Sequence, residues 1–425
     1  MTSNDQRPWV GEGKFYTSPS NFDPSIREAF AGAKRPAAPQ LYDSTVRKIL
    51  LTPGLRPSIA GMVRVAAAVE AVGIKHFTTN IHWWNEDEPE ALEWAVAETI
   101  LRRNFDFSTT ITLDTAWSDN WRKGVEDLAE LGMVRPVFLI QPMREDRGTR
   151  SPEKVYDRVR MLMSELKSMG LEPGLMLTDA GRASWEDLVG LSRAGIDSGA
   201  TLLNVTDSGS SLSPHGMRVL LTNLRRELNT DIEFLVHTHD DFGLGTPVAI
   251  ETVGCGDSIE LSFNGISDRA GFPSFEEVIV ALESMYGVPT GLNVDKIQWA
   301  CKVTADESIA PHPWKAYSGD HAFMLDLPYA AAPALQRGRQ SFPPVWNCVD
   351  PQWLGYSSQM HLLRQFLMGP VLKSRLAALN LPTDDESVAK LRDMLAQQLA
   401  AKNEYPVWVP EETLDELCQL VLGTS

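Results

Sequence analysis

The sequence predicts a (β/α)8 TIM barrel followed by a helical C-terminal region. Short β-branched or apolar runs alternate with longer amphipathic runs eight times over about 250 residues, the usual size of such a barrel. Polar residues stand where each predicted strand ends, which is where a barrel gathers its chemistry. The alternative is a doubly wound open sheet, which needs a Gly-rich dinucleotide loop after its first strand, but residues 41–53 contain no such loop.

The elements follow one another in a regular order. Strands are predicted at residues 40–47, 74–80, 107–113, 135–141, 173–178, 201–206, 233–237 and 258–264. Helices are predicted between and after them, at residues 58–72, 88–103, 121–131, 152–169, 184–198, 214–228, 245–253 and 274–286. Ser151-Pro152 and Ser213-Pro214 each place a capping serine before a proline at the first helical position. Gly132 and Gly170 follow the last periodic residue of a helix, as C-terminal caps do.

The composition changes after the barrel, and we expect three regions. These are an N-terminal extension at residues 1–39, a TIM-barrel catalytic domain at residues 40–305, and a linker with a helical dimerisation region at residues 306–425. Prolines are frequent just after residue 305, and helical patterns resume at residues 358–379, 385–402 and 411–422. We expect this arm to form a homodimer with an interface above ~2,000 Å², which light scattering would test.

Charge and composition argue against several classes of function. The 425 residues include 39 basic and 56 acidic side chains, a net charge of −17, which argues against a nucleic-acid or anionic-membrane partner. Neither an apolar run of about 18 residues nor the apolar core of a signal peptide is present. The four cysteines are far apart and form no CxxC pair, which indicates reduced thiols and a cytoplasmic protein.

The polar residues at the predicted strand ends are candidate site residues. In chain order they are Arg47, Lys48, Asn80, His82, Asp114, Gln141, Thr178, Asp179, Thr206, Asp207, His237, His239 and Asn264. His237 and His239 stand two apart on a strand, so both imidazoles face one divalent ion or one substrate oxygen. For Asp114, Asp179 and Asp207 the alternative is that each only caps the following helix.

Several segments match the motifs of one enzyme family. His237-Thr-His239-Asp240-Asp241-Phe-Gly243 resembles H-x-H-N-D-x-G, and Asn264-Gly-Ile-Ser-Asp268-Arg269-Ala-Gly271-Phe272 resembles N-G-x-G-E-R-x-G-N. Asp43-Ser-Thr-Val-Arg47 resembles D-T-T-L-R, and Ser318-Gly319-Asp320-His321 resembles S-G-x-H after the barrel. These are motifs of the isopropylmalate, homocitrate and citramalate synthases and the hydroxymethylglutaryl-CoA lyases. The resemblance implies a metal-dependent transferase or lyase for a 2-oxo acid or related carboxylate, with acyl-CoA as a candidate co-substrate.

The resemblance breaks at the family's metal site. The metal-ligating Asp of the family is Lys48 here, its acidic partner is Leu50, and the Asn that completes the site is Phe272. The first histidine of the hinge is Ala316, whereas the second is kept as His321. The two barrel imidazoles alone are a poor site for magnesium or manganese, which prefer oxygen ligands. We therefore expect no divalent metal on the barrel histidine pair.

The altered site leaves three functions open. In the first, Lys48 beside Arg47 supplies the positive charge of the lost metal, or forms a Schiff base with a substrate carbonyl. In the second, carbon dioxide carbamylates Lys48 and an ordinary metal-dependent synthase results. In the third, the chain binds a ligand or partner but turns nothing over. For the first function, the alternative is that Lys48 simply points to solvent at the barrel rim. The retention of Arg47, His237 and His239 favours an enzyme.

Two sets of residues are therefore assigned to the site. The catalytic set is Arg47, Lys48, His237, His239, Asp240 and His321. The substrate-binding set is His82, Asp114, Gln141, Thr206, Asn264 and Phe272. Because Leu50, Phe272 and Ala316 replace polar residues of the family, we expect a more apolar pocket and a substrate bulkier than pyruvate.

Overall fold

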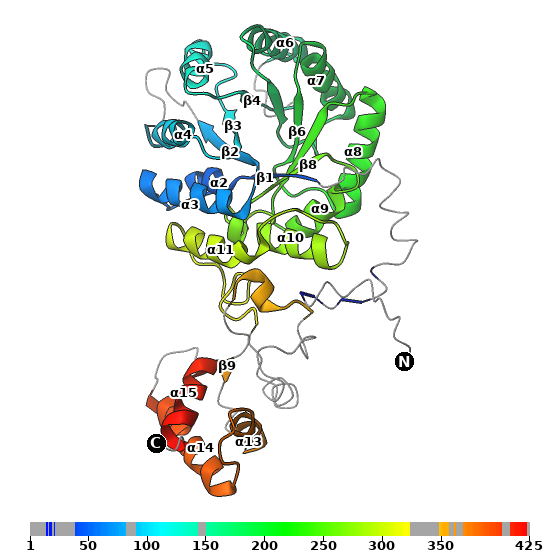
Figure 1. The fold of residues 1–425 in the computed structure, drawn as a ribbon. Helices are drawn as coiled ribbons and strands as arrows, with labels where there is room; N and C mark the ends of the chain where they lie inside the picture. The colour runs from blue at the N-terminus through cyan, green and yellow to red at the C-terminus, as the bar shows by residue number, and fades with distance from the viewer. Residues whose placement is uncertain are drawn as a thin grey trace. The chain divides into compact units, whose positions relative to one another are not determined.

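The computed structural model of the chain contains a closed barrel of eight parallel strands, β1 to β8 in sequence order, with helices around it (Figure 1). The residues that the structure describes are 14–15, 17–18, 21, 39–81, 91–142, 150–323, 348–356, 361–362, 369–401 and 409–422. The chain divides into two compact units, Asp23–Pro311 and a second unit made of Met1–Phe22 with His312–Ser425. The predicted (β/α)8 barrel is confirmed.

The barrel strands are short and are separated by helices. The strands are β1 (Gln40–Asp43), β2 (His76–Ile81), β3 (Ser108–Leu113), β4 (Arg135–Ile140), β5 (Gly174–Leu177), β6 (Leu202–Asp207), β7 (Glu233–Thr238) and β8 (Ser258–Leu261). The helices are α2 (Thr45–Leu51), α3 (Ile59–Val72), α4 (Ala91–Arg103), α5 (Trp121–Glu130), α6 (Pro152–Ser168), α7 (Trp185–Asp197), α8 (Pro214–Leu228), α9 (Gly245–Thr252), α10 (Phe275–Ser284) and α11 (Ile297–Asp306). The register from Gln40↔Ser258 to Asp43↔Leu261 closes β1 onto β8.

The serine caps form as the sequence predicts. The Ser151 side chain accepts a hydrogen bond from the backbone N–H of Lys154 at the start of α6, and Ser213 accepts one from Gly216 at the start of α8. A cap of this kind satisfies one of the backbone donors that a helix start leaves free. These helices therefore begin at their prolines, Pro152 and Pro214.

The first strand ends earlier than expected, and the prediction of a strand at residues 44–47 is wrong. The Asp43 carboxylate accepts hydrogen bonds from the Thr45 backbone N–H (3.0 Å) and from the Thr45 hydroxyl (2.7 Å). These bonds turn the chain into α2 at Thr45, so Arg47 and Lys48 lie on a helix and not on a strand. The strand predicted at residues 258–264 is also too long, because a 3₁₀ turn at Phe263–Gly265 follows β8.

The interior of the barrel has a thin apolar layer and a polar end. Residues two apart on a strand share a face, so alternate residues of each strand point into the barrel. The register of neighbouring strands places these inward-facing residues in layers across the interior. The apolar layer consists of Tyr42, Val137, Met176, Leu202 and Leu235, with Leu139 packed against it. Nearer the C-terminal ends of the strands, the inward positions are polar. They include Thr112, Asn204, Thr206, His237 and Glu260, all of which are buried.

The second unit contains helices α13 (Gly369–Ala378), α14 (Asp385–Ala401) and α15 (Glu411–Leu422). A two-stranded antiparallel sheet of β9 (His361–Leu362) and β10 (Val409–Pro410) accompanies them. The helix predicted at residues 358–379 is therefore wrong at residues 361–362, which pair as a strand. Arg375 on α13 binds the Asp415 carboxylate of α15 at 2.6 and 2.5 Å.

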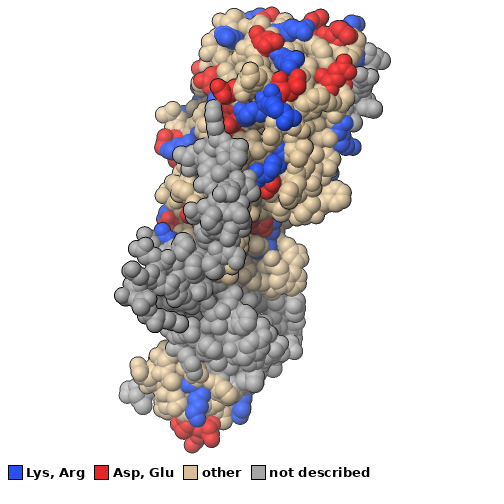
Figure 2. All heavy atoms as spheres, turned by 90° about the vertical axis from the view of Figure 1, so that its right-hand side faces the viewer, with Lys and Arg blue, Asp and Glu red and all other residues tan. Residues whose placement is uncertain are grey.

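Acidic and basic side chains are both present on the surface. On the face that Figure 2 shows, acidic and basic side chains are interspersed and do not form one acidic patch. Arg193 of α7 pairs with Glu227 of α8 at 2.8 Å, and Arg218 of α8 pairs with Glu251 of α9 at 2.5 Å. Such surface pairs contribute little each. No helix in the described part of the chain is both long and apolar enough to cross a membrane.

Candidate active site

Helix α2 directs two cationic side chains into the C-terminal end of the barrel. Nη1 of Arg47 lies 3.0 Å from Oε1 of Glu260 on β8 and 3.4 Å from Nδ1 of His237 on β7. Nζ of Lys48 lies 3.1 Å from Nε2 of His237 and 3.4 Å from Nε2 of His239. Lys48 is 1% exposed, so its side chain does not point to solvent at the rim. These contacts bring four of the predicted catalytic residues into one buried cluster.

Glu260 joins this cluster, although it is not among the predicted site residues. Its Oε1 accepts hydrogen bonds from the Ser44 hydroxyl (2.7 Å) and from Arg47 (3.0 Å), and its Oε2 is bonded to Nδ1 of His237. Burial alone would raise the pKa of Glu260, but His237 and Arg47 outweigh it and hold that pKa well below its usual range. Glu260 is the single charged residue in the strand Ser-Ile-Glu-Leu, and that is the signal that would have identified it.

Both imidazoles of the cluster are neutral. Burial, together with the neighbouring Lys48, lowers the pKa of His237 to about 3 and also lowers the pKa of His239. Because Nδ1 of His237 donates to Glu260, its Nε2 keeps a lone pair, and that lone pair accepts from the Lys48 amine. The Phe272 ring packs edge-on against His237 and His239, with centroid distances of 4.7 and 5.4 Å.

Lys48 has an unusual environment for a buried cation. Its Nζ sits 4.0 Å from the centroid of the Phe272 ring, and its hydrogen-bond partners are the two imidazoles. Among the residues that the structure describes, no carboxylate forms an ion pair with it. Burial and the adjacent Arg47 lower the pKa of Lys48 to about 7.

This donor set does not fit a divalent metal ion. Imidazole nitrogens bind such ions at about 2.0–2.2 Å, so an ion on both Nε2 atoms would occupy the space of the Lys48 amine. An ammonium next to a dication is strongly repelled. In the described ranges, no group of three or more His, Cys, Asp or Glu side chains could hold a metal ion.

Three other predicted residues are close in sequence to strands β6, β7 and β8 at this end of the barrel. Each of them forms a hydrogen bond to a residue outside the cluster. The Thr206 hydroxyl donates to Oδ1 of Asn204 (2.9 Å) inside the barrel. Asp240 accepts from the backbone N–H of Gly245 (2.6 Å), at the start of α9. The side-chain amide of Asn264 donates to the carbonyl oxygen of Cys301 on α11 (2.8 Å), so this donor links β8 to the helix layer.

The remaining predicted residues are not brought to the cluster by any described contact. Asp114 follows β3 and its backbone N–H donates to Ile81 O (3.3 Å), while Gln141 follows β4 and is exposed. His82 lies outside the described residues. His321 belongs to the second compact unit, where its ring packs edge-on against Trp314 at 5.6 Å.

Arg269 holds the loops around the site together. Its guanidinium donates to Asp241 after β7 (2.9 Å), to the Ser208 carbonyl after β6 (2.6 Å) and to Asp268 after β8 (2.5 Å). Oδ1 of Asp268 lies 3.8 Å from Nδ1 of His239. The residue is held with φ of +55°, a conformation that non-glycine residues rarely adopt.

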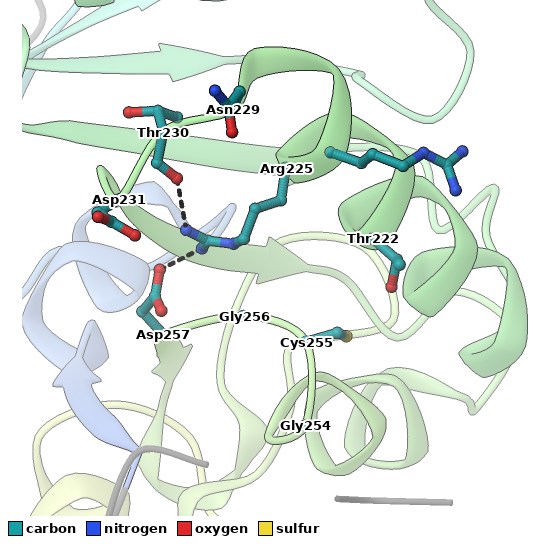
Figure 3. Close-up of a pocket in the computed structure, with 10 residues that line it drawn as sticks. Thr222, Arg225, Asn229, Thr230, Asp231, Gly254, Cys255, Gly256 and Asp257 are labelled. Carbon is teal, nitrogen blue, oxygen red and sulfur yellow. Dashed lines mark hydrogen bonds and ion pairs between the residues drawn. The ribbon is translucent and has the colours of Figure 1, made fainter. Parts of the chain in front are cut away.

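A cavity of about 490 Å³ lies at the opposite end of the barrel (Figure 3). Its lining residues include Asn229, Thr230 and Asp231 before β7, and Gly256 and Asp257 before β8. In Figure 3 the Arg225 guanidinium points to Asp257 and to the Thr230 carbonyl. It forms an ion pair with Asp257 and donates a hydrogen bond to the Thr230 carbonyl oxygen. These contacts fix the turns that enter β7 and β8. The cavity therefore lies at the N-terminal end, where barrels keep stabilising residues.

The similarity to known proteins covers the barrel. The HMGL-like family model matches residues 38–303. A homocitrate synthase of Methanopyrus kandleri is 24% identical over 401 residues, covering 94% of this chain and 96% of the relative. A 2-isopropylmalate synthase of Pyrococcus abyssi is 25% identical over 360 residues, covering 82% of this chain and 72% of the relative. The crystal structure of the HMG-CoA lyase of Bacillus subtilis has a similar fold, with a TM-score of 0.56, 15% identity and coverage of 66% and 96%.

Proposed function

The chain belongs to the HMGL-like family, and from this premise we propose that it forms or cleaves a carbon–carbon bond of a 2-oxo acid or a related carboxylate. The relatives named above are synthases, and the similar fold is that of a lyase. We further propose that the amine of Lys48 stands in for the divalent metal of the family. Acyl-CoA is a candidate co-substrate.

One observation carries the proposal: the Lys48 amine lies within hydrogen-bond distance of both barrel imidazoles, 3.1 and 3.4 Å away. Positive charge at that point stabilises negative charge that develops on a substrate oxygen, and it acts strongly because the cluster is buried. Arg47, held by Glu260 at 3.0 Å, adds a second cation on the other side of His237.

The cluster also contains the groups needed for proton transfer. His237 is neutral, and its Nε2 keeps a lone pair because its Nδ1 donates to Glu260, while His239 beside it is also neutral. When His237 takes up a proton, Glu260 at its Nδ1 stabilises the imidazolium that forms. The chain's own residues therefore bind an anion, polarise a carbonyl and move a proton.

The test uses the full chain after treatment with a chelator and elemental analysis. Calorimetry measures binding of pyruvate and of 4-methyl-2-oxopentanoate, and a thiol assay measures release of coenzyme A from acetyl-CoA in their presence. We expect binding, and any turnover, to be insensitive to the chelator. Lys48→Met should abolish both, whereas Lys75→Met, at an exposed lysine paired with Asp106, should change neither.

The other outcomes separate the alternatives. Stoichiometric metal with chelator-sensitive activity, and a carbamate on Lys48 in the mass spectrum, would make the chain an ordinary metal-dependent synthase. Binding with no turnover of any tested pair would indicate a ligand-binding descendant. Absence of binding for every 2-oxo acid would contradict the proposed substrate class.

A further inference from the structure

The surroundings of the Lys48 amine suit a nucleophile better than a charge alone. Fully buried lysines are rare unless they are paired with a carboxylate, and in the described part of the chain no carboxylate pairs with Lys48. Its contacts are two imidazole nitrogens and an aromatic face. We propose that Nζ of Lys48 forms an imine with the keto carbon of a 2-oxo acid, which makes the substrate a carbon nucleophile at C3. This inference rests on the proposed function and deepens it.

The two histidines are placed to take protons from this amine and from the imine. Nδ1 of His237 donates to Glu260, so its Nε2 lone pair faces Nζ at 3.1 Å. Nε2 of His239 lies 3.4 Å from Nζ, and Nδ1 of the same ring faces Asp268 at 3.8 Å. In an imine, C3 is two bonds from Nζ, so its protons come within reach of the same two Nε2 atoms.

Arg47 provides a place for the carboxylate of the substrate. Its Nη1 donates to Glu260, and its Nη2 contacts the sulfur of Met176 at 3.6 Å. Nε of Arg47 is buried without a hydrogen-bond partner in the described structure. A buried donor of this kind is costly unless a ligand or water satisfies it. Lys48 and Arg47 contact the two ring nitrogens of His237, so the amine that takes the carbonyl and the guanidinium that takes the carboxylate belong to one cluster.

The chemistry balances with no cofactor. The Lys48 amine adds to C2 of the 2-oxo acid, and the carbonyl oxygen leaves as water to give a protonated imine. A proton then moves from C3 to Nε2 of His237 or His239, and the C3–H bonding electrons form the enamine. The enamine adds to an aldehyde to form a C3–C4 bond, and the protonated histidine gives its proton to the aldehyde oxygen, which becomes the C4 hydroxyl. Water then releases a 4-hydroxy-2-oxo acid from the lysine. The reverse sequence cleaves that bond.

This mechanism selects the lyase side of the proposed function. Attack of an external carbanion on C2 of the imine would leave the product joined to Lys48 by a carbon–nitrogen bond that water cannot hydrolyse. Bond formation at C3 leaves the imine intact, and hydrolysis then frees the enzyme. The substrate class is therefore a 2-oxo acid that carries at least one hydrogen on C3.

Two measurements on the metal-stripped full chain test the imine. In deuterium oxide, proton NMR follows loss of the C3 hydrogens of pyruvate and of 4-methyl-2-oxopentanoate. In parallel, cyanoborohydride traps the imine, and peptide mass spectrometry locates the reduced adduct. We expect exchange of the C3 hydrogens and an adduct on the peptide that contains Lys48. Lys48→Arg keeps the charge but cannot form the imine, so exchange should fall roughly 1,000-fold or more, whereas Lys75→Arg should exchange like the wild type.

The outcomes distinguish this inference from the function on which it rests. If the wild type binds either acid in calorimetry but gives no adduct and no exchange, the imine is wrong and the proposed function remains. If Lys48→Arg keeps full exchange, the charge alone acts and the imine is again wrong. If no 2-oxo acid binds, both fail. Circular dichroism of Lys48→Arg and Lys48→Met controls for folding, and trapping on the wild type needs no variant.

Discussion

The two ends of the barrel interior contain similar residue types but balance their charges differently. At the N-terminal end, Arg135 binds Glu233 at 3.2 Å and Glu172 at 2.9 Å, and Glu233 also accepts from Tyr42 (2.9 Å) and Ser258 (2.7 Å). One cation there faces two carboxylates. At the C-terminal end, the cations Arg47 and Lys48 face one carboxylate, Glu260, and two neutral imidazoles. The first arrangement closes the barrel, whereas the second leaves positive charge and donors for an anion.

The comparison predicts the largest effect for the buried Glu260 and a smaller one for the half-buried Glu233. Glu260→Gln removes the carboxylate that Arg47 and His237 share, and it leaves the charge of Arg47 uncompensated in a buried site. We expect a loss of about 3–5 kcal/mol in the free energy of unfolding. Glu233→Gln keeps acceptors for Tyr42 and Ser258, and Arg135 keeps Glu172, so the loss should be about 1–2 kcal/mol. Urea unfolding followed by tryptophan fluorescence measures both, and equal losses would contradict the comparison.

A second prediction converts the C-terminal cluster into a metal site. Lys48→Asp removes the ammonium and places a carboxylate beside the two imidazoles. Manganese at 100 times its dissociation constant should then stabilise the variant by about 2.7 kcal/mol, whereas the wild type should show no such shift. Thermal melts with and without manganese measure the difference. His237→Ala in the Lys48→Asp background is the control. Metal-dependent stabilisation of the wild type would show that Lys48 does not occupy the metal position.

A third prediction is that removing a cation changes the free energy of unfolding in opposite directions at the two ends. Lys48→Met replaces a buried amine that has no carboxylate partner with an apolar side chain of similar length. We expect it to raise the free energy of unfolding by about 1–2 kcal/mol while turnover is lost. Arg135→Met, in contrast, leaves Glu233 without its cation at the other end and should destabilise the barrel. Urea unfolding measures the free energy of unfolding of both variants. A Lys48→Met variant less stable than the wild type would contradict the prediction that the buried amine destabilises the fold.

Much of this arrangement could be predicted from the sequence because the signals are periodic. The alternation of strand and helix patterns predicts the barrel, and the strand-end rule selects His237 and His239. Lys48 stands out because the resemblance aligns it with a carboxylate of the family, and this one difference led to the proposed chemistry. A single sequence is enough for these predictions, because the periodicity of apolar residues and the residue types at the strand ends can be observed in it directly.

The rest depended on side-chain geometry that a pattern does not contain. Asp43 ends β1 by bonding Thr45, and this local cap turns Arg47 and Lys48 inward on a helix. Glu260 was missed because one charged residue in a short strand has no periodicity, although a charge in such a strand must be paired when buried. Helix α11 was not predicted, and its Cys301 carbonyl is the acceptor that holds the Asn264 amide.

The smallest predicted effect tests whether the N-terminal end tolerates extra positive charge. His76 stacks on Tyr42 with a centroid distance of 4.5 Å, and burial lowers its pKa below the usual value of about 6.5. The unfolded chain therefore takes up a proton at a higher pH than the native chain does, so native stability falls as the pH drops through about 6.5. His76→Phe keeps the ring stack but cannot take up a proton. In urea unfolding between pH 8 and pH 5, wild type and variant should differ by a constant amount above pH 7. Below pH 6.5 the wild type should lose stability relative to the variant. A difference that does not change with pH would show that this end accepts a protonated His76, and the contrast between the two ends would then rest on Glu233 and Arg135 alone.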